Sequence, residues 1–553
     1  MPLYLKQVSP LEKVCLYDNT DCLKSKNSYT ALAGQRVSYQ IVIKNQDIRE
    51  KIREVWIESP LKENIRLYAV KEVIVDKPSR EPVVDEDYLL TSSGMLPDVL
   101  VPLEHQGSLV AFNGANVTIW VKLDIPTSLA PGKYPIEFFV KTGFDGEASE
   151  CESISMQIEV LPAKIPEQKL KYTRWFYADC IADAHSAEIF SERHWMLIEK
   201  YIAAATDVGI NMILVPIHTP PLDTEVGTRR PCVQLVDIEK RGEDYFFDFG
   251  KFRRFIEICK RNGVKYYEMA HLFSQWGSKC APNILVTENG KSDYKFGWHV
   301  AADSKEYTSF LRQYIAAISE ELEREGIAEQ TYFHVSDEPK PDNLDRYEIA
   351  RNIIKPLIGN SKTLDALSHC EFYEKGLVEC PVTSVRNAHE FISRNVEELW
   401  VYYCCGPERV FPNSFIAMPS ARVRALGFLL YKYDIKGFLH WGFNFYNSQV
   451  SMYKINPYLT TSSDGAFPSG DAFIVYPGRE SAYPSIRGEI TFEAMQDVRI
   501  CQALEALIGK QKVVEMIDGA AGRNIRFDDY PANNDFFENL REEMLAAIAK
   551  NTK

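Results

Sequence analysis

The chain has 553 residues, of which 45% are hydrophobic, and it carries a formal net charge of −14 with a pI of about 5.4. This length allows more than one domain with a sizeable core, and the acidic balance excludes a general affinity for nucleic acid or anionic membranes. No apolar run approaches the roughly 20 residues of a membrane helix, so membrane insertion is not expected.

The first residues, the cysteines and the histidines indicate the cellular compartment and whether a metal or cofactor is expected. The first residues lack a basic region followed by an apolar stretch, so we expect no signal peptide and a cytoplasmic location. The twelve cysteines are scattered, with Cys404 and Cys405 the only adjacent pair, and we interpret them as reduced thiols. The ten histidines form no H-E-x-x-H spacing. We therefore expect neither a metal nor a cofactor.

Short alternating segments recur in the first part of the chain. Examples are residues 36–43, 117–123 and 134–140, and turn residues such as Pro131 and Gly132 separate them. Spaced short strands without helical periods predict an antiparallel β-sandwich over residues 1–165. The proline-containing stretch that ends it is interpreted as a stiff linker.

After this linker, strand patterns alternate with helical ones over residues 166–487. The predicted strands are 172–179, 211–217, 264–270, 331–336, 362–367, 382–386, 399–404 and 436–441. Helical patterns between them include 191–208, 303–325, 343–355 and 418–433. Eight such units predict a (β/α)8 (TIM) barrel, so the fold class is multi-domain β plus α/β. Amphipathic stretches at 490–507 and 536–549 predict a C-terminal helical extension, residues 488–553, packed on the barrel.

Two adjacent carboxylates, Asp337 and Glu338, follow the fourth predicted barrel strand. Chemistry in such barrels lies at the carboxyl ends of the strands. Two neighbouring acids repel, so the pKa of one should rise, and a carboxyl with a raised pKa can act as a general acid near neutral pH. The sequence therefore predicts an acid–base site here.

The ends of the other predicted strands carry aromatic, amide and histidine side chains. Aromatic faces cover the apolar face of a sugar ring, while amides and carboxylates bind its hydroxyls, so these side chains predict a carbohydrate site. The candidate substrate-binding residues are Trp175, His218, His271, Gln275, Trp276, Asp365, Tyr403, Trp441 and Asn444.

Several of these segments resemble glycoside hydrolase family 123, the β-N-acetylgalactosaminidases, which have an N-terminal β-sandwich and a C-terminal barrel. The resemblance rests on residues 334–339, 273–277, 437–444 and 470–478, and it covers most of residues 165–500. It implies an exo-acting enzyme that releases terminal β-linked N-acetylgalactosamine, with a glycan or glycolipid as its partner.

The resemblance also implies a retaining, substrate-assisted mechanism in which the sugar's own 2-acetamido oxygen attacks the anomeric carbon. Glu338 matches the general acid/base, and Asp337 matches the residue that polarises the acetamido N–H. Such enzymes are exceptions to the usual two-carboxylate rule. An ionised Asp337 would stabilise the positive intermediate and would hold the proton on Glu338.

The sequence leaves other mechanisms and functions open. The seventh strand segment, 399–405, ends without an acid, and Asp rather than Asn precedes Glu338; both features favour the acetamido-assisted route. Another barrel glycosidase could use Glu338 with Glu268 or Asp365 as a separate carboxylate. A non-catalytic carbohydrate-binding protein is a further alternative, and the histidine spacing argues against a metal hydrolase.

Overall fold

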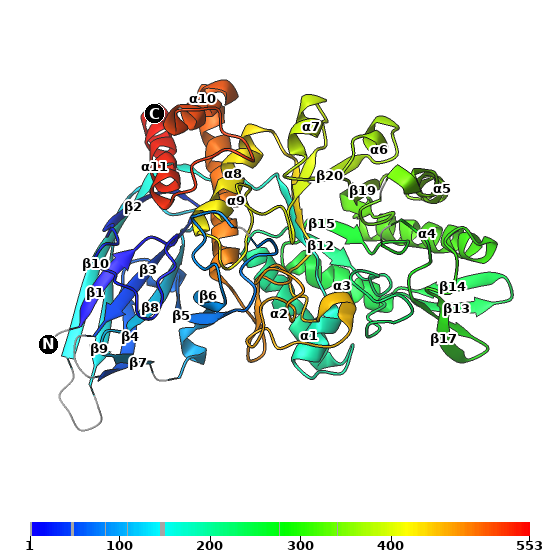
Figure 1. The fold of residues 1–553 in the computed structure, drawn as a ribbon, viewed down its shortest axis with the longest axis horizontal. Coiled ribbons are helices and arrows are strands. Elements are labelled where there is room, and N and C mark those ends of the chain that lie inside the picture. Colours follow the sequence, from blue (N-terminus) through cyan, green and yellow to red (C-terminus); the bar gives the residue numbers. More distant parts are fainter. Residues whose placement is uncertain are drawn as a thin grey trace.

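The computed structural model describes residues 3–45, 49–82, 84–107, 109–143, 150–275, 277–339 and 341–552. Figure 1 shows a β-rich N-terminal part (blue to cyan) beside a barrel built from the middle of the chain (green to yellow). The last helices (orange and red) lie near the N-terminal sheets and helix α8 (Ser420–Lys432). Among the described helices, none is both long and apolar enough to span a membrane.

The described N-terminal part contains two five-stranded sheets. In sheet order, the first comprises β1 (Tyr4–Val8), β3 (Arg36–Lys44), β8 (Asn116–Asp124), β5 (Ile65–Val75) and β6 (Gly94–Pro102). The second comprises β2 (Ser28–Ala33), β10 (Glu150–Lys164), β9 (Gly132–Thr142), β4 (Arg49–Glu58) and β7 (Leu109–Phe112). Inward side chains of both sheets share one apolar cluster, for example Tyr39 and Ile119 with Phe138 and Ile158.

The strand pairing departs from the expected fully antiparallel arrangement at one place, because β2 pairs with β10 in parallel. More than a hundred residues separate these two strands in the chain, and parallel neighbours require such a long connection. The other edge of β10 pairs antiparallel with β9, as the alternation predicts.

Eight parallel strands of the described chain close into a barrel. They are β11 (Lys171–Arg174), β12 (Met212–Val215), β15 (Tyr266–Met269), β18 (Thr331–Phe333), β19 (Lys362–Ala366), β20 (Cys380–Ser384), β21 (Trp400–Tyr402) and β22 (Gly437–His440). Each overlaps one predicted strand, so the barrel prediction is confirmed. Seven of these strands are shorter than predicted, and β20 has the predicted length but begins two residues earlier.

The helices follow the predicted alternation. They are α1 (Ala178–Ala184), α2 (Glu192–Asp207), α3 (Gly250–Arg261), α4 (Lys305–Glu325), α5 (Leu344–Ile354), α6 (Glu371–Glu374), α7 (Ala388–Ser393), α8 (Ser420–Lys432), α9 (Ile486–Ile508), α10 (Lys510–Ala521) and α11 (Asn534–Asn551). Short 3-10 helices are η1 (Lys62–Asn64), η2 (Leu103–His105), η3 (Ala328–Gln330), η4 (Pro341–Asn343) and η5 (Gln449–Ser451).

Two small sheets lie outside the barrel. The sequence prediction missed both, since their strands fall in long connections between barrel elements. One comprises β14 (Asp244–Asp248), β13 (Asp237–Arg241), β16 (Ile284–Glu288) and β17 (Lys291–Phe296), and the other comprises β23 (Tyr476–Pro477) and β24 (Ala482–Tyr483).

The C-terminal helices contact both parts of the molecule. Helix α9 packs against α8, and a Cβ added to Gly427 would meet the carbonyl oxygen of Ala494 at 2.2 Å, so only glycine allows this approach. Helix α11 contacts α9 as well as strands β2 and β10. The predicted boundary at residue 487 falls in the first turn of α9, and the domain boundaries themselves remain predictions.

Buried charges also join the N-terminal sheets to the barrel. Lys122 of β8 is fully buried, and its ammonium lies 2.6 Å from both Asp207 of α2 and Glu489 of α9. Removing one partner of such a group would leave an uncompensated buried charge, which is strongly destabilising. This network therefore fixes the orientation of the sheets on the barrel.

Candidate active site

The two candidate acids lie in the loop that follows β18, at the carboxyl edge of the barrel. The strand ends at Phe333, earlier than predicted, so Asp337 and Glu338 belong to the loop rather than to the strand end. Ser336 anchors this loop by donating a hydrogen bond of 3.1 Å to the carbonyl of Ser274. Glu338 has a φ of 44°, a conformation uncommon for a residue other than glycine, and such conformations concentrate at functional sites.

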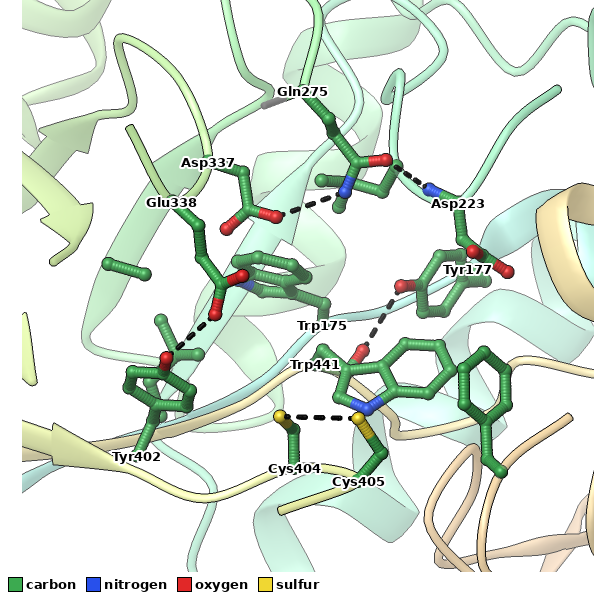
Figure 2. A pocket seen from close by; sticks show the side chains of 14 residues that line it. Trp175, Tyr177, Asp223, Gln275, Asp337, Glu338, Tyr402, Cys404, Cys405 and Trp441 are labelled. Atoms are coloured by element: carbon green, nitrogen blue, oxygen red, sulfur yellow. Dashed lines mark hydrogen bonds between the residues drawn. The ribbon is translucent and has the colours of Figure 1, made fainter. Parts of the chain in front are cut away.

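Each acid has a hydrogen-bond donor that orients it (Figure 2). Nε2 of Gln275 donates to Oδ2 of Asp337 at 3.0 Å, and the phenol of Tyr402 donates to Oε1 of Glu338 at 2.7 Å. Gln275 is itself held, because its Oε1 accepts the backbone N–H of Asp223 at 2.6 Å. The amide of Gln275 can therefore present only its N–H group to Asp337.

One acid of the pair has a raised pKa, as the repulsion argument predicts. Burial and then the nearby charge of Glu338 raise the pKa of Asp337 to about 7, and the hydrogen bond from Gln275 opposes this only in part. Asp337 is 9% exposed. In the free protein the proton of the pair thus favours Asp337 near neutral pH, whereas the sequence argument placed it on Glu338.

A pocket opens beside the pair, lined by the ends of several barrel strands and their loops. Figure 2 shows the acids on one side of it and Trp441 on the other. The lining residues are Trp175, Tyr177, Leu222, Asp223, Gln275, Asp337, Glu338, Ala366, Tyr402, Cys404, Cys405, Leu439, Trp441 and Phe467. The structure thus brings together five of the predicted residues, namely Asp337, Glu338, Gln275, Trp175 and Trp441.

Trp441 is fixed from several sides, which keeps its ring available as a platform. Its Nε1 donates to Oδ2 of the buried Asp471 at 2.9 Å, and its backbone carbonyl accepts from the phenol of Tyr177 at 3.1 Å. Phe445 and Phe467 contact its ring edge to face, with centroids 5.2 and 5.0 Å away. A side chain held in this way loses little conformational entropy when a ligand stacks on it.

The second tryptophan of the pocket rests on a buried charged network. Nε1 of Trp175 donates to Glu268 at 3.1 Å, and Glu268 also pairs with Nε2 of His334 at 2.8 Å. The other ring nitrogen of His334 faces Asp365 at 3.3 Å. Burial alone would lower the pKa of His334, but the hydrogen bonds to Asp365 and Glu268 outweigh it and raise that pKa to about 9. The two acidic neighbours therefore favour the protonated form of His334.

Five predicted substrate-binding residues are buried outside the pocket lining, and this corrects their expected placement. Asp365 pairs with His334 and accepts the backbone N–H of Val335 at 3.1 Å, and the ring of His271 stacks on that of His334. His218 bonds the carbonyl of His271 at 2.9 Å. The amide of Asn444 bonds both backbone groups of Tyr177, and Tyr403 packs on Phe438 and His440. Trp276 lies outside the described residues.

The burial of Tyr403 shows why residues at strand ends are easily assigned to the wrong face. Successive side chains of a strand point to opposite faces, so a register error of one residue exchanges a pocket residue for a core residue. Tyr402 lines the pocket and Tyr403 is fully buried. Strand β21 has only three residues, too few for an alternation to define this register, so the sequence carried no clear signal for Tyr402.

The pocket also contains a third carboxylate that sequence reasoning missed. Asp223 lies in the loop after β12, and its Oδ2 accepts the backbone N–H of Val450 at 2.9 Å. Burial raises the pKa of Asp223 to about 6. No periodic pattern surrounds this residue, so the sequence carried no signal for it.

Among the described residues, His271, His334 and Asp365 have ligand atoms within 4.8 Å of one another, as a metal site requires. However, both ring nitrogens of His334 are already engaged by carboxylates, and the two rings stack at 4.1 Å with an interplanar angle of 15°. Ring-nitrogen lone pairs lie in the ring plane, so parallel stacked rings do not direct them to one point. This arrangement suits an ion pair better than a metal ion.

Comparison with known proteins identifies a family and a solved structure of similar fold. Residues 175–504 match the family model described as glycoside hydrolase 123, catalytic domain. A family 123 glycoside hydrolase from Clostridium perfringens, described in connection with glycolipid glycan hydrolysis, is similar over 100% of this chain and 97% of its own, with 16% identity and a TM-score of 0.72. At this identity the likeness shows the fold alone.

Two further solved structures are much less similar. A family 5 mannosidase from Rhizomucor miehei covers 62% of this chain and 94% of its own, with 12% identity and a TM-score of 0.31. A family 2 glycosyl hydrolase from Bacteroides cellulosilyticus covers 77% of this chain and 46% of its own, with 9% identity and a TM-score of 0.28. Likenesses this weak carry no argument. No match is found among curated proteins.

Proposed function

This chain belongs to glycoside hydrolase family 123 and is a glycosidase, and on that premise we propose that it releases terminal β-linked N-acetylgalactosamine with retention of configuration. The observation that supports this most directly is the pair Asp337 and Glu338, held on one pocket wall by Gln275 and Tyr402. The end of β21 supplies Tyr402 there, not an acid.

In the proposed first step, the oxygen of the sugar's 2-acetamido group attacks the anomeric carbon. The bond to the leaving oxygen breaks, and Glu338 transfers its proton to that oxygen. Asp337 accepts a hydrogen bond from the acetamido N–H and stabilises the positive charge of the cyclic intermediate. In the second step Glu338 takes a proton from water, which attacks the same carbon and restores the original configuration.

Substrate binding is proposed to move the proton shared by Asp337 and Glu338 to the position that catalysis needs. One proton shared by the pair favours the buried Asp337 when the pocket is empty. An acetamido N–H needs an acceptor, so it binds best when Asp337 is ionised and the proton has moved to Glu338. Substrates with a 2-acetamido group would thus select the reactive form, in which Asp337 is ionised and Glu338 carries the proton.

The remaining pocket residues suit a terminal sugar ring. Trp441 and Trp175 offer aromatic surfaces for its C–H faces, and the free oxygen of Asp223 can accept its hydroxyl groups. The partner would be a glycan or a glycolipid. A cytoplasmic location remains a proposal, supported by the free thiols of the described cysteines.

A two-carboxylate glycosidase is the second candidate, and Asp223 is the observation that favours it. Glu268 and Asp365, the partners suggested by the sequence, are fully buried and bonded to His334, so they do not line the pocket. Asp223 does line it. In that reading Asp223 would act as nucleophile or base, and the 2-acetamido group would be dispensable.

A panel of nitrophenyl glycosides distinguishes the candidates: β-GalNAc, β-GlcNAc, β-Gal and α-GalNAc. The proposal expects turnover of β-GalNAc, essentially none of β-Gal or α-GalNAc, and inhibition by a thiazoline analogue of the acetamido-derived intermediate. Comparable rates on β-Gal and β-GalNAc would instead favour the two-carboxylate route. No turnover of any member would support a non-catalytic sugar-binding protein.

A further inference from the structure

Two adjacent thiols line the substrate pocket directly after strand β21. Cys404 and Cys405 are both free and half-buried, and their sulfur atoms lie 3.9 Å apart. Figure 2 shows both sulfurs next to the indole of Trp441 in this view, with Cys404 on the side toward Tyr402. Two thiols that share one wall of a cavity can bind a single ligand together, which an isolated cysteine cannot do.

A cation from the N-terminal part of the chain adjoins this pair. Nη1 of Arg80 donates to the sulfur of Cys405 at 3.6 Å. The loop that carries Arg80 is fixed in place, because the buried carboxylate of Glu408 accepts the backbone N–H groups of Arg80 and Glu81 at 2.6 and 3.0 Å. Arg80 therefore remains close to the thiol pair.

The two thiols differ in acidity as a result. The hydrogen bond from Cys404 and the charge of Arg80 lower the pKa of Cys405 to about 7 against the effect of burial. The same hydrogen bond, together with burial, raises the pKa of Cys404. A thiolate is the nucleophile and metal ligand in cysteine chemistry, so Cys405 is the thiol that reacts first.

We propose that Cys404 and Cys405 form a bidentate thiol site in the pocket wall that captures soft, thiophilic ligands, specifically monosubstituted trivalent arsenicals. Thiolates are the side chains that select such soft centres. With an organoarsenic(III) oxide, each sulfur forms one bond to arsenic, and the two thiol protons leave with the oxide oxygen as one molecule of water. No electron transfer is involved, so no oxidant is needed.

Occupation of this site would close the pocket to substrate. The captured group would sit between Tyr402, which bonds Glu338, and the ring of Trp441. A sugar cannot occupy the same space, so capture and turnover are expected to exclude each other. This inference goes beyond the proposed sugar specificity and holds for any substrate of this pocket.

The test treats the 553-residue chain with phenylarsine oxide. The intact mass should show one added phenylarsenic group that monothiols do not remove, and peptide mapping should place it on residues 404–405. Turnover of the preferred aryl glycoside should be lost. Because a cyclic dithiol adduct resists monothiols, excess 2-mercaptoethanol should not remove the group, whereas 2,3-dimercaptopropanol should remove it and restore turnover.

Cysteine variants test which thiols bind the arsenical without relying on enzyme activity. Cys404→Ser and Cys405→Ser should each lose the monothiol-resistant adduct, whereas Cys22→Ser, at an exposed cysteine, should keep it. Cys404→Ala provides a second variant should the serine disturb folding, which circular dichroism would reveal. A wild-type adduct that 2-mercaptoethanol removes, a resistant adduct in Cys405→Ser, or full turnover with the adduct in place would each overturn the proposal. Since mass is the primary readout, failure of the proposed sugar specificity would not be mistaken for failure of this site.

Discussion

The phenol of Tyr402 donates a hydrogen bond of 2.7 Å to Oε1 of Glu338. Tyr402 is the last residue of β21, so a barrel strand rather than a loop holds the donor. Glu338 itself lies in a loop with an unusual backbone conformation. The orientation of the candidate general acid thus depends on a side chain more than sixty residues away in the chain.

Tyr402→Phe tests this dependence. We expect a loss of kcat of roughly 10-fold to 100-fold, since a hydrogen bond to a charged group is worth about 1.5–3 kcal/mol. Tyr403→Phe is the matched control, because the ring of Tyr403 is buried against Phe438. Equal losses in steady-state kinetics for the two variants would contradict the proposed role of Tyr402.

Asp337 and Glu338 should respond differently to the leaving group. Glu338→Gln cannot donate a proton, so substrates with poor leaving groups should suffer most and activated aryl glycosides should be partly spared. Asp337→Asn loses the negative charge and should slow all substrates by roughly 10²–10³. Plots of rate against leaving-group pKa check this, and a steep plot for Asp337→Asn with a uniform loss for Glu338→Gln would reverse the two roles.

The pH dependence of kcat/KM should follow the shared proton of the acid pair. Burial and the charge of Glu338 raise the pKa of Asp337 to about 7, and coupled groups titrate as a pair. Turnover needs one proton on the pair, so kcat/KM should fall as the pH rises through about 7. Asp337→Asn should move this alkaline limb to lower pH, because it removes the charge that helps hold the proton on Glu338. A limb that stays at the same pH in the variant would contradict the assignment.

The same raised pKa predicts a stability change. Between about pH 4 and pH 7 the folded chain keeps a proton on Asp337 that the unfolded chain has lost, so this group destabilises the fold progressively as pH rises through that window. Asp337→Asn should raise the free energy of unfolding by roughly 1–4 kcal/mol above pH 7, at about 1.4 kcal/mol per pKa unit, and by little near pH 4. Denaturant titrations at pH 4 and 8 measure this, with the exposed Asp345→Asn as control. A gain that is equal at both pH values would exclude the linkage.

Trp441 should act mainly on substrate binding. Trp441→Ala removes the aromatic surface from the pocket wall and should lower kcat/KM by roughly 10-fold or more, a loss of about 1.4 kcal/mol or more. Its thermal midpoint should fall only modestly, because the ring is partly buried, although its loss leaves the buried Asp471 without this donor. Trp56→Ala, at a half-buried tryptophan of strand β4, is the control. If Trp441→Ala unfolds while the remaining folded protein binds normally, the ring serves packing instead.

The sequence alone predicted the eight-stranded barrel and the position of the acid pair after its fourth strand. Strand patterns that alternate with helical ones located all eight barrel strands, and the short motif at residues 334–339 drew attention to Asp337 and Glu338. These features are local: a strand's hydrophobic pattern and an acidic pair after it can be seen within a few residues.

Only the tertiary structure decided which neighbours complete the pocket. Gln275, Tyr402 and Arg80 come from three distant segments, and their contacts exist because the barrel closes and the N-terminal sheets dock on it. Whether a strand residue faces the pocket or the core depends on the register, and an error of one residue reverses it. Strand β21 has only three residues, too few for the sequence pattern to define the register, as Tyr402 and Tyr403 show. Loop residues such as Asp223 carry no periodicity, so their positions follow from packing alone.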